Sequence, residues 1–358
     1  MFGRLKRWLA RLFASLKGGI ARLFRRPPPV PGGRWIGGHH HEPRGSLAFA
    51  PLVAPHRPYR LYLPAGHDAG ERLPMLVMLH GCQQDVESFA AGTRMNALAD
   101  RERLVVLYPE QRRLANVHRC WNWFDPSTQR GRGEAAIIAG MVRAVAAKYN
   151  VDGSRIWVAG LSAGGAMASI LASCHAELFA ACAVHSGLMF QAAGSPGAAA
   201  RAMERGSAVD PLKAGRMAYE ISAKEVDAMP AMVVHGDRDE RVNPVNADQV
   251  IAQFAQMNEL ALSARDRAFD DVQDRVKVEM SAGGYRYEIH DRLCDGQPLL
   301  RKVMIEGLGH AWSGGDGQYP YNDPRGPDAN ELMWNFFRLH RRAASSGQTT
   351  EPAQATSN

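Results

Sequence analysis

The fold is decided by one stretch of the chain, Arg155-Ile156-Trp157-Val158-Ala159-Gly160-Leu161-Ser162-Ala163-Gly164-Gly165. An apolar segment with strand character leads into Gly-x-Ser-x-Gly, and a helical pattern follows over residues 163–173. Glycines in this motif permit a tight strand-to-helix turn, which raises the serine hydroxyl above a sheet and places it at a helix N-terminus. The pattern predicts that Ser162 is a catalytic nucleophile. The alternative is a glycine-rich turn with an exposed serine.

Strands alternate with helices on both sides of this turn. The predicted strands are short and apolar, and they cover residues 59–63, 73–80, 104–108, 179–184 and 231–235. Helical patterns lie between several of them, at residues 85–101, 134–149 and 245–257. This order predicts an α/β fold with a mostly parallel central sheet and helices on both faces. Residues 285–293 and 299–308 flank Asp295-Gly296 and predict a hairpin or an insertion near the end of the sheet.

A serine hydroxyl is a weak nucleophile, so the sequence must also supply a base. Where this turn occurs in hydrolases, an acid and then a histidine follow the serine along the chain. His310 lies in Gly309-His310-Ala311-Trp312, directly after the last convincing strand, and we predict that it is the base. Other histidines fit less well, because they lie on a terminal helix, inside a strand or ahead of the remaining elements: His340, His290, His185 and His235.

The acid that orients the histidine should follow an intermediate strand. Residues 231–235 lead into Gly236-Asp237-Arg238-Asp239-Glu240, which offers three carboxylates. We favour Asp239, because Asp237 comes early enough in the turn to serve as a turn-forming or capping residue. Asp237 and Glu240 stay as alternatives, and a solvated carboxylate paired with a neighbouring arginine is the non-functional interpretation.

Acyl transfer also needs hydrogen-bond donors for the oxyanion of the tetrahedral intermediate. The residue after the nucleophile supplies one backbone N–H group, which is here that of Ala163. A second usually comes from the loop after an early strand, here His80-Gly81-Cys82-Gln83, and Cys82 occupies the donor position. A plain glycine turn is the alternative for this short motif.

Six motifs occur in the order that one family shows. They are Leu79-His80-Gly81-Cys82-Gln83-Gln84, Tyr108-Pro109-Glu110-Gln111, Cys120-Trp121-Asn122-Trp123-Phe124, the serine turn, His235-Gly236-x-x-Asp239 and Gly309-His310-Ala311-Trp312-Ser313-Gly314-Gly315. Together they resemble the polyhydroxybutyrate (PHB) depolymerase-family esterases, which are related to acetylxylan and feruloyl esterases of carbohydrate esterase family one. The resemblance extends from Pro58 to Arg338.

The resemblance implies an α/β-hydrolase fold and hydrolysis of carboxylic esters without a metal or organic cofactor. Carried over residue by residue, it implies a catalytic triad of Ser162, Asp239 and His310. The expected substrates are short-chain esters or hydroxyalkanoate oligomers, with acetylxylan or feruloyl esters as the alternative. Polymer-degrading members often carry a separate substrate-binding domain, which we do not recognise here, so small substrates are expected ahead of solid PHB.

Aromatic and sulfur-containing side chains cluster near the predicted site. Trp121, Trp123 and Trp312 should lie near the carboxyl edge of the sheet, where ligands bind in open α/β folds, and we predict that they contact substrate. Core packing is an equal alternative for Trp121 and Trp123. Cys82 and Cys120 fall at neighbouring strand ends, so a disulfide between them and a free buried thiol are both open.

The first 26 residues differ in composition from the rest. They carry eight basic residues and no acidic one, so the formal net charge of +7 leaves about −1 (7 − 8 = −1) for the remainder. Apolar residues recur at spacings of three and four, which predicts an amphipathic helix lying on an anionic membrane or polymer-granule surface. A helix packed on its own domain and a wrongly assigned start are the alternatives. The near-neutral remainder argues against a nucleic-acid partner.

The rest of the chain divides by composition. Residues 27–56 are rich in Pro, Gly and His and predict a linker, in which His39 to His41 are a solvated loop and not a metal site. Residues 57–342 form the predicted catalytic domain, with a possible lid at 187–229. Residues 343–358 are polar and predict a disordered tail.

Two other classes of protein compete with this interpretation. Peptidases of the prolyl-oligopeptidase type share the triad order, but they add an N-terminal propeller that about fifty residues cannot form. A membrane- or granule-coating protein with a hydrolase scaffold would use residues 1–26, although an intact triad argues against it. The resemblance suggests secretion, while basic residues interrupt any signal-peptide core. A cytoplasmic protein that is peripheral on a membrane or granule is therefore the alternative.

Overall fold

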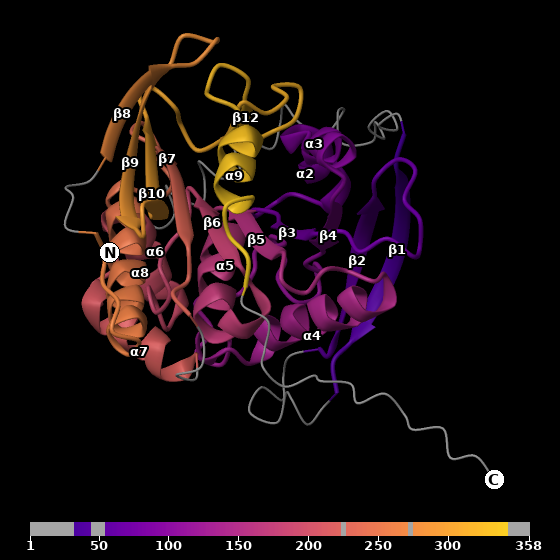
Figure 1. Ribbon diagram of the computed structural model, residues 1–358, viewed down its shortest axis with the longest axis horizontal. Helices are drawn as coiled ribbons and strands as arrows, with labels where there is room; N and C mark the ends of the chain where they lie inside the picture. The colour runs from indigo at the N-terminus through magenta and orange to yellow at the C-terminus, as the bar shows by residue number, and fades with distance from the viewer. Residues whose placement is uncertain (1–31, 44–53, 223–226, 271–274, 343–358) are drawn as a thin grey trace. The chain divides into compact units, whose positions relative to one another are not determined.

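The computed structural model describes residues 32–43, 54–222, 227–270 and 275–342. Its centre is a ten-stranded sheet in the order β1-β2-β4-β3-β5-β6-β7-β10-β9-β8 (Figure 1). The strands β4 to β10 in this order are parallel, and antiparallel strands flank them on both sides. The bounds are β1 Arg34–His41, β2 His56–Leu63, β3 Met75–Leu79, β4 Val105–Pro109, β5 Ile156–Leu161, β6 Ala181–His185, β7 Ala231–Gly236, β8 Arg275–Met280, β9 Arg286–Cys294 and β10 Gln297–Ile305. The predicted mostly parallel sheet is confirmed.

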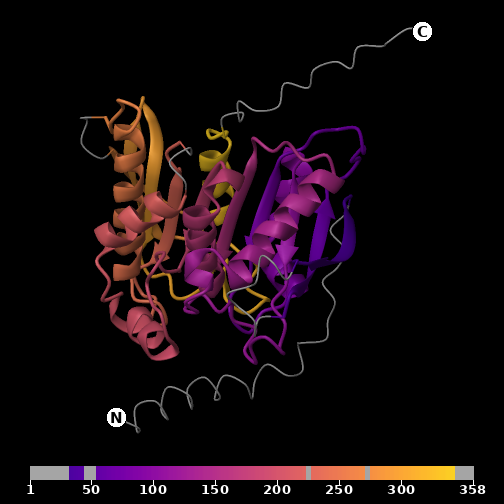
Figure 2. The same ribbon diagram turned by 90° about the horizontal axis from the view of Figure 1, so that it is seen from below.

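Helices cover both faces of the sheet, and Figure 2 shows the two layers from below. One core packs the sheet against α4, α5 and α8, and the other packs it against α2, α3 and α9. The bounds are α2 Val86–Thr93, α3 Met95–Glu102, α4 Gly133–Lys148, α5 Ala163–Cys174, α6 Pro196–Arg205, α7 Pro211–Ile221, α8 Val245–Ser263 and α9 Ala329–Phe337. Two short strands, β11 (Trp312–Ser313) and β12 (Asn322–Asp323), pair separately.

Strand β5 lies in the middle of the sheet and is apolar on both sides. Ile156 and Val158 point into the core beneath α4 and α5, whereas Trp157 and Ala159 point into the core beneath α9. Successive side chains of a strand alternate between its faces, so a strand covered on both sides has no polar position. This explains why the strand before Ser162 is a continuous apolar run.

Part of the predicted linker is a strand, which corrects our division of the chain. Residues 34–41 form β1 and pair antiparallel with β2 along their whole length, so His39 to His41 belong to the sheet and not to a solvated loop. The glycines that suggested a linker make room for tyrosine rings: a Cβ at Gly38 would overlap the ring of Tyr59, and one at Gly33 would overlap the hydroxyl of Tyr62. These glycines therefore allow close packing between β1 and β2 and do not indicate a linker.

Of the hairpin and the insertion that the sequence left open near the end of the sheet, the structure contains the hairpin. Strands β9 and β10 pair antiparallel, and Asp295 and Gly296, which connect them, both have positive φ, as a two-residue hairpin turn requires. β10 in turn lies parallel to β7. The chain leaving β10 therefore emerges at the same edge of the sheet as the chain leaving β7.

Helices α6 and α7 occupy the segment that we predicted as a possible lid. Their contacts are with α8 and, for α7, also with α5. The lid function of residues 187–229 stays a prediction, because these contacts describe packing beside the sheet and not closure over Ser162. Residues 1–26, the predicted amphipathic arm, and residues 343–358, the predicted tail, lie outside the described residues. Within the described ranges, we find no helix with the length and apolar character needed to cross a bilayer.

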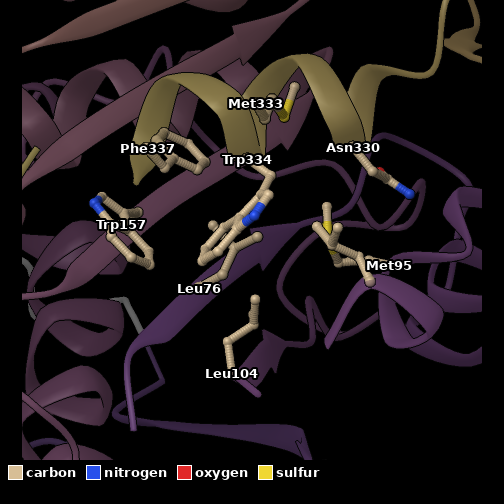
Figure 3. A pocket seen from close by; sticks show the side chains of 9 residues that line it. Leu76, Met95, Leu104, Trp157, Asn330, Met333, Trp334 and Phe337 are labelled. Carbon is tan, nitrogen blue, oxygen red and sulfur yellow. The ribbon is translucent and has the colours of Figure 1, made fainter. Parts of the chain in front are cut away.

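Trp157 joins the last helix to the sheet (Figure 3). Its ring stacks on Phe337, with centroids 5.7 Å apart, and meets Trp334 edge-on at 5.8 Å. Its indole N–H donates to the backbone oxygen of His340 at 3.2 Å. Leu76 and Met333 close the other sides of this apolar contact. A single β5 side chain thus fixes α9 on the face opposite α5.

We expect Trp157→Ala to lower the free energy of unfolding by about 3–5 kcal/mol, because it removes a buried aromatic ring and leaves a cavity. The measurement is urea denaturation followed by circular dichroism. Leu114→Ala is the control, since Leu114 is 90% exposed and its loss should change stability by no more than about 0.5 kcal/mol. Equal effects of the two substitutions would contradict the packing described for α9.

Candidate active site

Ser162 lies between β5 and α5 in a backbone conformation that few residues adopt. Its φ is 58° and its ψ is −118°, a region that costs free energy unless the surroundings hold it. The turn is held by close contacts: a Cβ at Gly164 would overlap the carbonyl oxygen of Leu79, and one at Gly160 would overlap the backbone of Gly164. Glycine is therefore required at both positions, and Ser162 lies at the carboxyl end of β5.

His310 and Asp239 lie together at this same edge. The loop after β10 carries His310 and the loop after β7 carries Asp239, and His310 Nδ1 lies 2.8 Å from Asp239 Oδ2. The other oxygen, Oδ1, accepts from the backbone N–H groups of Arg241 and Val242, each at 2.9 Å. Burial works to raise the pKa of Asp239, but the hydrogen bond and charge interaction with His310, followed by His235 and the backbone N–H of Val242, lower it overall. Asp239 is therefore an ionised carboxylate that accepts a hydrogen bond from His310.

The competing carboxylates occupy different positions. Asp237 accepts a hydrogen bond from the backbone N–H of Gly307 at 2.7 Å and so joins the β7 loop to the loop that leads to His310. Glu240 is exposed. Among the three carboxylates considered, Asp239 is the one that bonds to the His310 ring in the described structure. The side-chain bond that Asp237 makes thus joins two loops and does not stabilise its own turn.

Two buried histidines connect the loops around this pair. His185 accepts from the backbone N–H of Ser313 at 3.1 Å through Nε2, and its carbonyl oxygen accepts from the N–H of Ser162 at 2.9 Å. His235 Nε2 lies 2.9 Å from the carbonyl oxygen of Val242 and 3.5 Å from Asp239 Oδ2. Burial lowers the pKa of both histidines, to about 3 for His185, so both are neutral. They bind loops together and carry no charge into the site.

The loop after β3 lies directly against Ser162. A Cβ at Gly81 would lie 3.5 Å from the Cβ of Ser162, so no side chain separates the two segments. Ala163 is the first residue of α5, where a backbone N–H has no acceptor within the helix. In the part of the chain that the structure describes, no protein group accepts a hydrogen bond from the N–H of Cys82 or of Ala163. Both N–H groups therefore remain available for a ligand.

Cys82 and Cys120 form a disulfide, which settles the pairing that the sequence left open. It joins the loop after β3 to the segment that contains Trp121 and Trp123, 38 residues further on. Cys174, Cys182 and Cys294 are free. The covalent bond ties Cys82, in the loop that lies against Ser162, to the segment that begins at Cys120.

The three tryptophans predicted to contact substrate are instead core residues. Exposed fractions are 0% for Trp121 and Trp312 and 3% for Trp123. The Trp121 indole donates to the carbonyl oxygen of His80 at 3.2 Å, and the Trp312 indole donates to Asn330 Oδ1 at 3.2 Å. With their rings buried and both of these N–H groups bonded internally, they support the loops from behind. The rings pack beneath the loops at this edge of the sheet and are not exposed to solvent, where a substrate would contact them.

Tyr321 is a neighbour of His310 that the sequence did not single out. Its ring meets that of His310 edge-on at 6.3 Å, and its hydroxyl donates to Gln83 Oε1 at 2.9 Å. It therefore spans from the histidine to the loop that contains Cys82. No spacing in the sequence distinguishes this tyrosine; its positive φ of 61° becomes visible only in the structure.

Comparison with solved structures defines the class of fold. An acetyl xylan esterase from Aspergillus awamori superposes with a TM-score of 0.63 at 19% identity, over 86% of this chain and 99% of that one. A puromycin-hydrolyzing peptidase from Mycobacterium tuberculosis gives 0.51 at 17%, over 87% of this chain and 40% of that one. At these identities the likeness concerns the fold alone. The molecule is an α/β-hydrolase, as the serine turn predicted.

The sequence profile described as Esterase PHB depolymerase matches residues 57–278, and the chain belongs to that family. Poly(3-hydroxyalkanoate) depolymerase C from Paucimonas lemoignei is 31% identical over 70% of this chain. Feruloyl esterase B from Neurospora crassa is 29% identical over 55% of this chain and 69% of its own length. The chain spans 57% of the depolymerase. The predicted family is therefore confirmed over the peptidase alternative.

The described residues hold no group of three or more His, Cys, Asp or Glu side chains arranged to bind a metal ion. His40, in the sequence cluster of histidines, pairs instead with Glu42 at 2.9 Å.

Thiol titration tests the disulfide. Protein purified without reductant and unfolded in concentrated guanidinium chloride should show three reactive thiols, those of Cys174, Cys182 and Cys294. Reduction before titration should raise the count to five, the number of cysteines in the chain. Cys120→Ser should give four thiols with or without reductant, because its partner is then free. Five thiols in the unreduced native sequence would contradict the disulfide.

Proposed function

We propose that this protein is a serine esterase in which Ser162 is the nucleophile, His310 the general base and Asp239 the acid that orients His310. The hydrogen bond of 2.8 Å between His310 and Asp239, at the sheet edge where Ser162 lies, is the observation that carries the proposal. A carboxylate at Nδ1 holds the proton on that nitrogen and leaves Nε2 free to accept the serine proton. The strained turn at Ser162 supports the nucleophile assignment, since such strain concentrates at functional sites.

The reaction proceeds in two balanced stages. The Ser162 oxygen attacks the ester carbonyl carbon while His310 takes the hydroxyl proton. The tetrahedral intermediate then collapses, the C–O bond to the alcohol breaks, and His310 returns the proton to the leaving alcohol. Water attacks the resulting acyl-enzyme with His310 again as base, and the carboxylic acid leaves as Ser162 regains its proton. Asp239 stabilises the imidazolium that forms in each stage.

The oxyanion hole is formed by the backbone N–H groups of Cys82 and Ala163. Cys82 lies in the loop after β3, which lies against Ser162, and Ala163 begins α5 directly after Ser162; neither N–H bonds to a protein acceptor within the described residues. Donors fixed before the reaction stabilise the charge that develops on the carbonyl oxygen, and losing one typically lowers kcat by about 100- to 1,000-fold. Because these donors belong to the main chain, any carboxylic ester whose carbonyl reaches them is a candidate substrate.

Short-chain esters and hydroxyalkanoate oligomers are the substrates that we propose. The support is the family match together with the poly(3-hydroxyalkanoate) depolymerase relative. Acetylxylan- or feruloyl-type esters are the second candidate, because feruloyl esterase B is also a relative. Binding of residues 1–26 to an anionic membrane or granule surface stays a prediction, as does the absence of a nucleic-acid partner.

We expect Ser162→Ala to lower kcat on p-nitrophenyl butyrate by several orders of magnitude, because the nucleophilic oxygen is lost. His310→Ala should behave alike, since the serine then has no base. Initial rates are measured on protein that circular dichroism shows to be folded. Ser154→Ala is the matched control, because Ser154 bonds to Asp152 in a loop away from the sheet edge. Turnover near normal in folded Ser162→Ala would refute the assignment.

Asparagine substitutions distinguish the two aspartates. Asp239→Asn should lower kcat by about 10,000-fold, because the amide favours the wrong histidine tautomer. Asp237→Asn should reduce kcat far less, since Asp237 accepts a backbone hydrogen bond in the neighbouring loop. The two purified variants are compared at saturating p-nitrophenyl acetate. A larger loss in Asp237→Asn would assign the acid to residue 237.

A further inference from the structure

The loop after β3, which carries the proposed donor Cys82 and is called the oxyanion loop below, connects through hydrogen bonds to a buried carboxylate on another element. Glu134 lies in the first turn of α4, is 2% exposed, and accepts four hydrogen bonds. Its Oε1 accepts hydrogen bonds from Arg57 Nη2 at 2.9 Å, Gln111 Nε2 at 2.6 Å and Asn122 Nδ2 at 2.9 Å. Its Oε2 receives the backbone N–H of Asn122 at 2.7 Å. A charge removed from water needs such a set of donors, and Arg57, which is 1% exposed, balances it.

The carboxylate connects to the oxyanion loop through Gln111 and His80. The Gln111 amide, held by Glu134, also donates to the carbonyl oxygen of Cys120 at 3.0 Å. The backbone N–H of the same glutamine donates to His80 Nε2 at 3.1 Å. Because a backbone N–H can only donate, Nε2 must be the accepting nitrogen of His80, and the proton of the neutral ring resides on Nδ1. Burial lowers the pKa of His80 to about 4, which keeps the ring neutral.

The tautomer of His80 fixes the direction of the Cys82 N–H. His80 Nδ1–H donates to the carbonyl oxygen of Gly81 at 2.8 Å. The peptide between Gly81 and Cys82 is planar and trans, so its carbonyl and its N–H point in opposite directions. Drawing the Gly81 oxygen toward the buried histidine therefore turns the Cys82 N–H away from it. The Gly81 N–H is held separately by Gln84 Oε1 at 2.8 Å.

We propose that Glu134 is a positioning residue for the oxyanion hole, acting through Gln111 and His80 on the Cys82 peptide. The proposal rests on the proposed role of Cys82 as an oxyanion donor. Glu134 touches no substrate atom; its charge holds the residues after β4 and the Asn122 segment in one arrangement, and the hydrogen-bond chain transfers that arrangement to the peptide. The disulfide fixes the position of Cys82, and the series of hydrogen bonds from Glu134 fixes the direction of its N–H.

The test is Glu134→Gln in the full chain. The amide keeps the size of the side chain, but it loses the charge and presents a donor to the Asn122 N–H or to Gln111. We expect kcat on p-nitrophenyl butyrate to fall by about 10- to 100-fold, less than complete loss of an oxyanion donor, with KM changed by no more than about threefold. The inhibition constant of an alkyl trifluoromethyl ketone should rise in proportion to the loss of kcat/KM, because its adduct with serine carries the oxyanion.

Asp291→Asn is the matched control. Asp291, which is buried, makes a second ion pair, with the partly buried Arg301 at 2.6 and 2.7 Å, within the β9–β10 hairpin. Its loss should destabilise the fold by a similar mechanism and leave kcat and the ketone inhibition constant near their normal values. Equal losses of kcat in both variants, or a loss in Glu134→Gln without weaker ketone binding, would overturn the proposal.

A second variant covers the case in which Glu134→Gln does not fold. Gln111→Met keeps the ion pair and the length of the side chain and removes only the amide that Glu134 holds. It should lower kcat and weaken ketone binding together, by a smaller factor, and normal values of both would overturn the proposal. Ser162→Ala separates this outcome from failure of the proposed function: an inactive Ser162→Ala beside a normal Glu134→Gln refutes the positioning role alone.

Discussion

The backbone of α5 passes so close to the end of β3 that no side chain fits between them. A Cβ at Gly164 would overlap the carbonyl oxygens of both Leu79 and His80, and one at Gly160 would overlap α5 itself. This contact forces Ser162 into its strained conformation and at the same time brings the loop after β3 against it. The proposed nucleophile and one proposed oxyanion donor are therefore positioned by the same close packing of α5 against β3.

Neutral histidines hold the loops that surround this contact. His80 bonds the β3 loop to the residues after β4, His185 bonds the β6 end to the loop with His310, and His235 bonds within the loop that carries Asp239. An imidazole offers one donor and one acceptor on opposite sides of a rigid ring, which suits it to join two backbone segments. Burial depresses the pKa of these three rings, so they remain neutral.

Local patterns predicted the parts of the fold that depend on local rules. The apolar run before Ser162 and the glycines after it identify a strand and a tight turn, and Asp295-Gly296 identifies the hairpin, because each follows from backbone sterics. Strand β1 was missed, since its glycines resemble a linker until Tyr59 and Tyr62 are seen to cover them. The prediction that the tryptophans contact substrate differs from their buried positions, because the direction of a ring depends on contacts distant in sequence. Glu134 likewise looks like an ordinary acidic residue in a first helical turn.

Both proposed oxyanion donors are main-chain groups, so no residue type encodes them. Replacement of the side chain at 82 or 163 leaves the N–H in place, and a scan of single substitutions across the site would record those positions as chemically silent. The direction of these N–H groups depends instead on residues that set the local backbone conformation, which lie on other elements and touch no substrate. Catalysis by the proposed oxyanion hole can therefore be changed by substitutions at positions that contact no substrate.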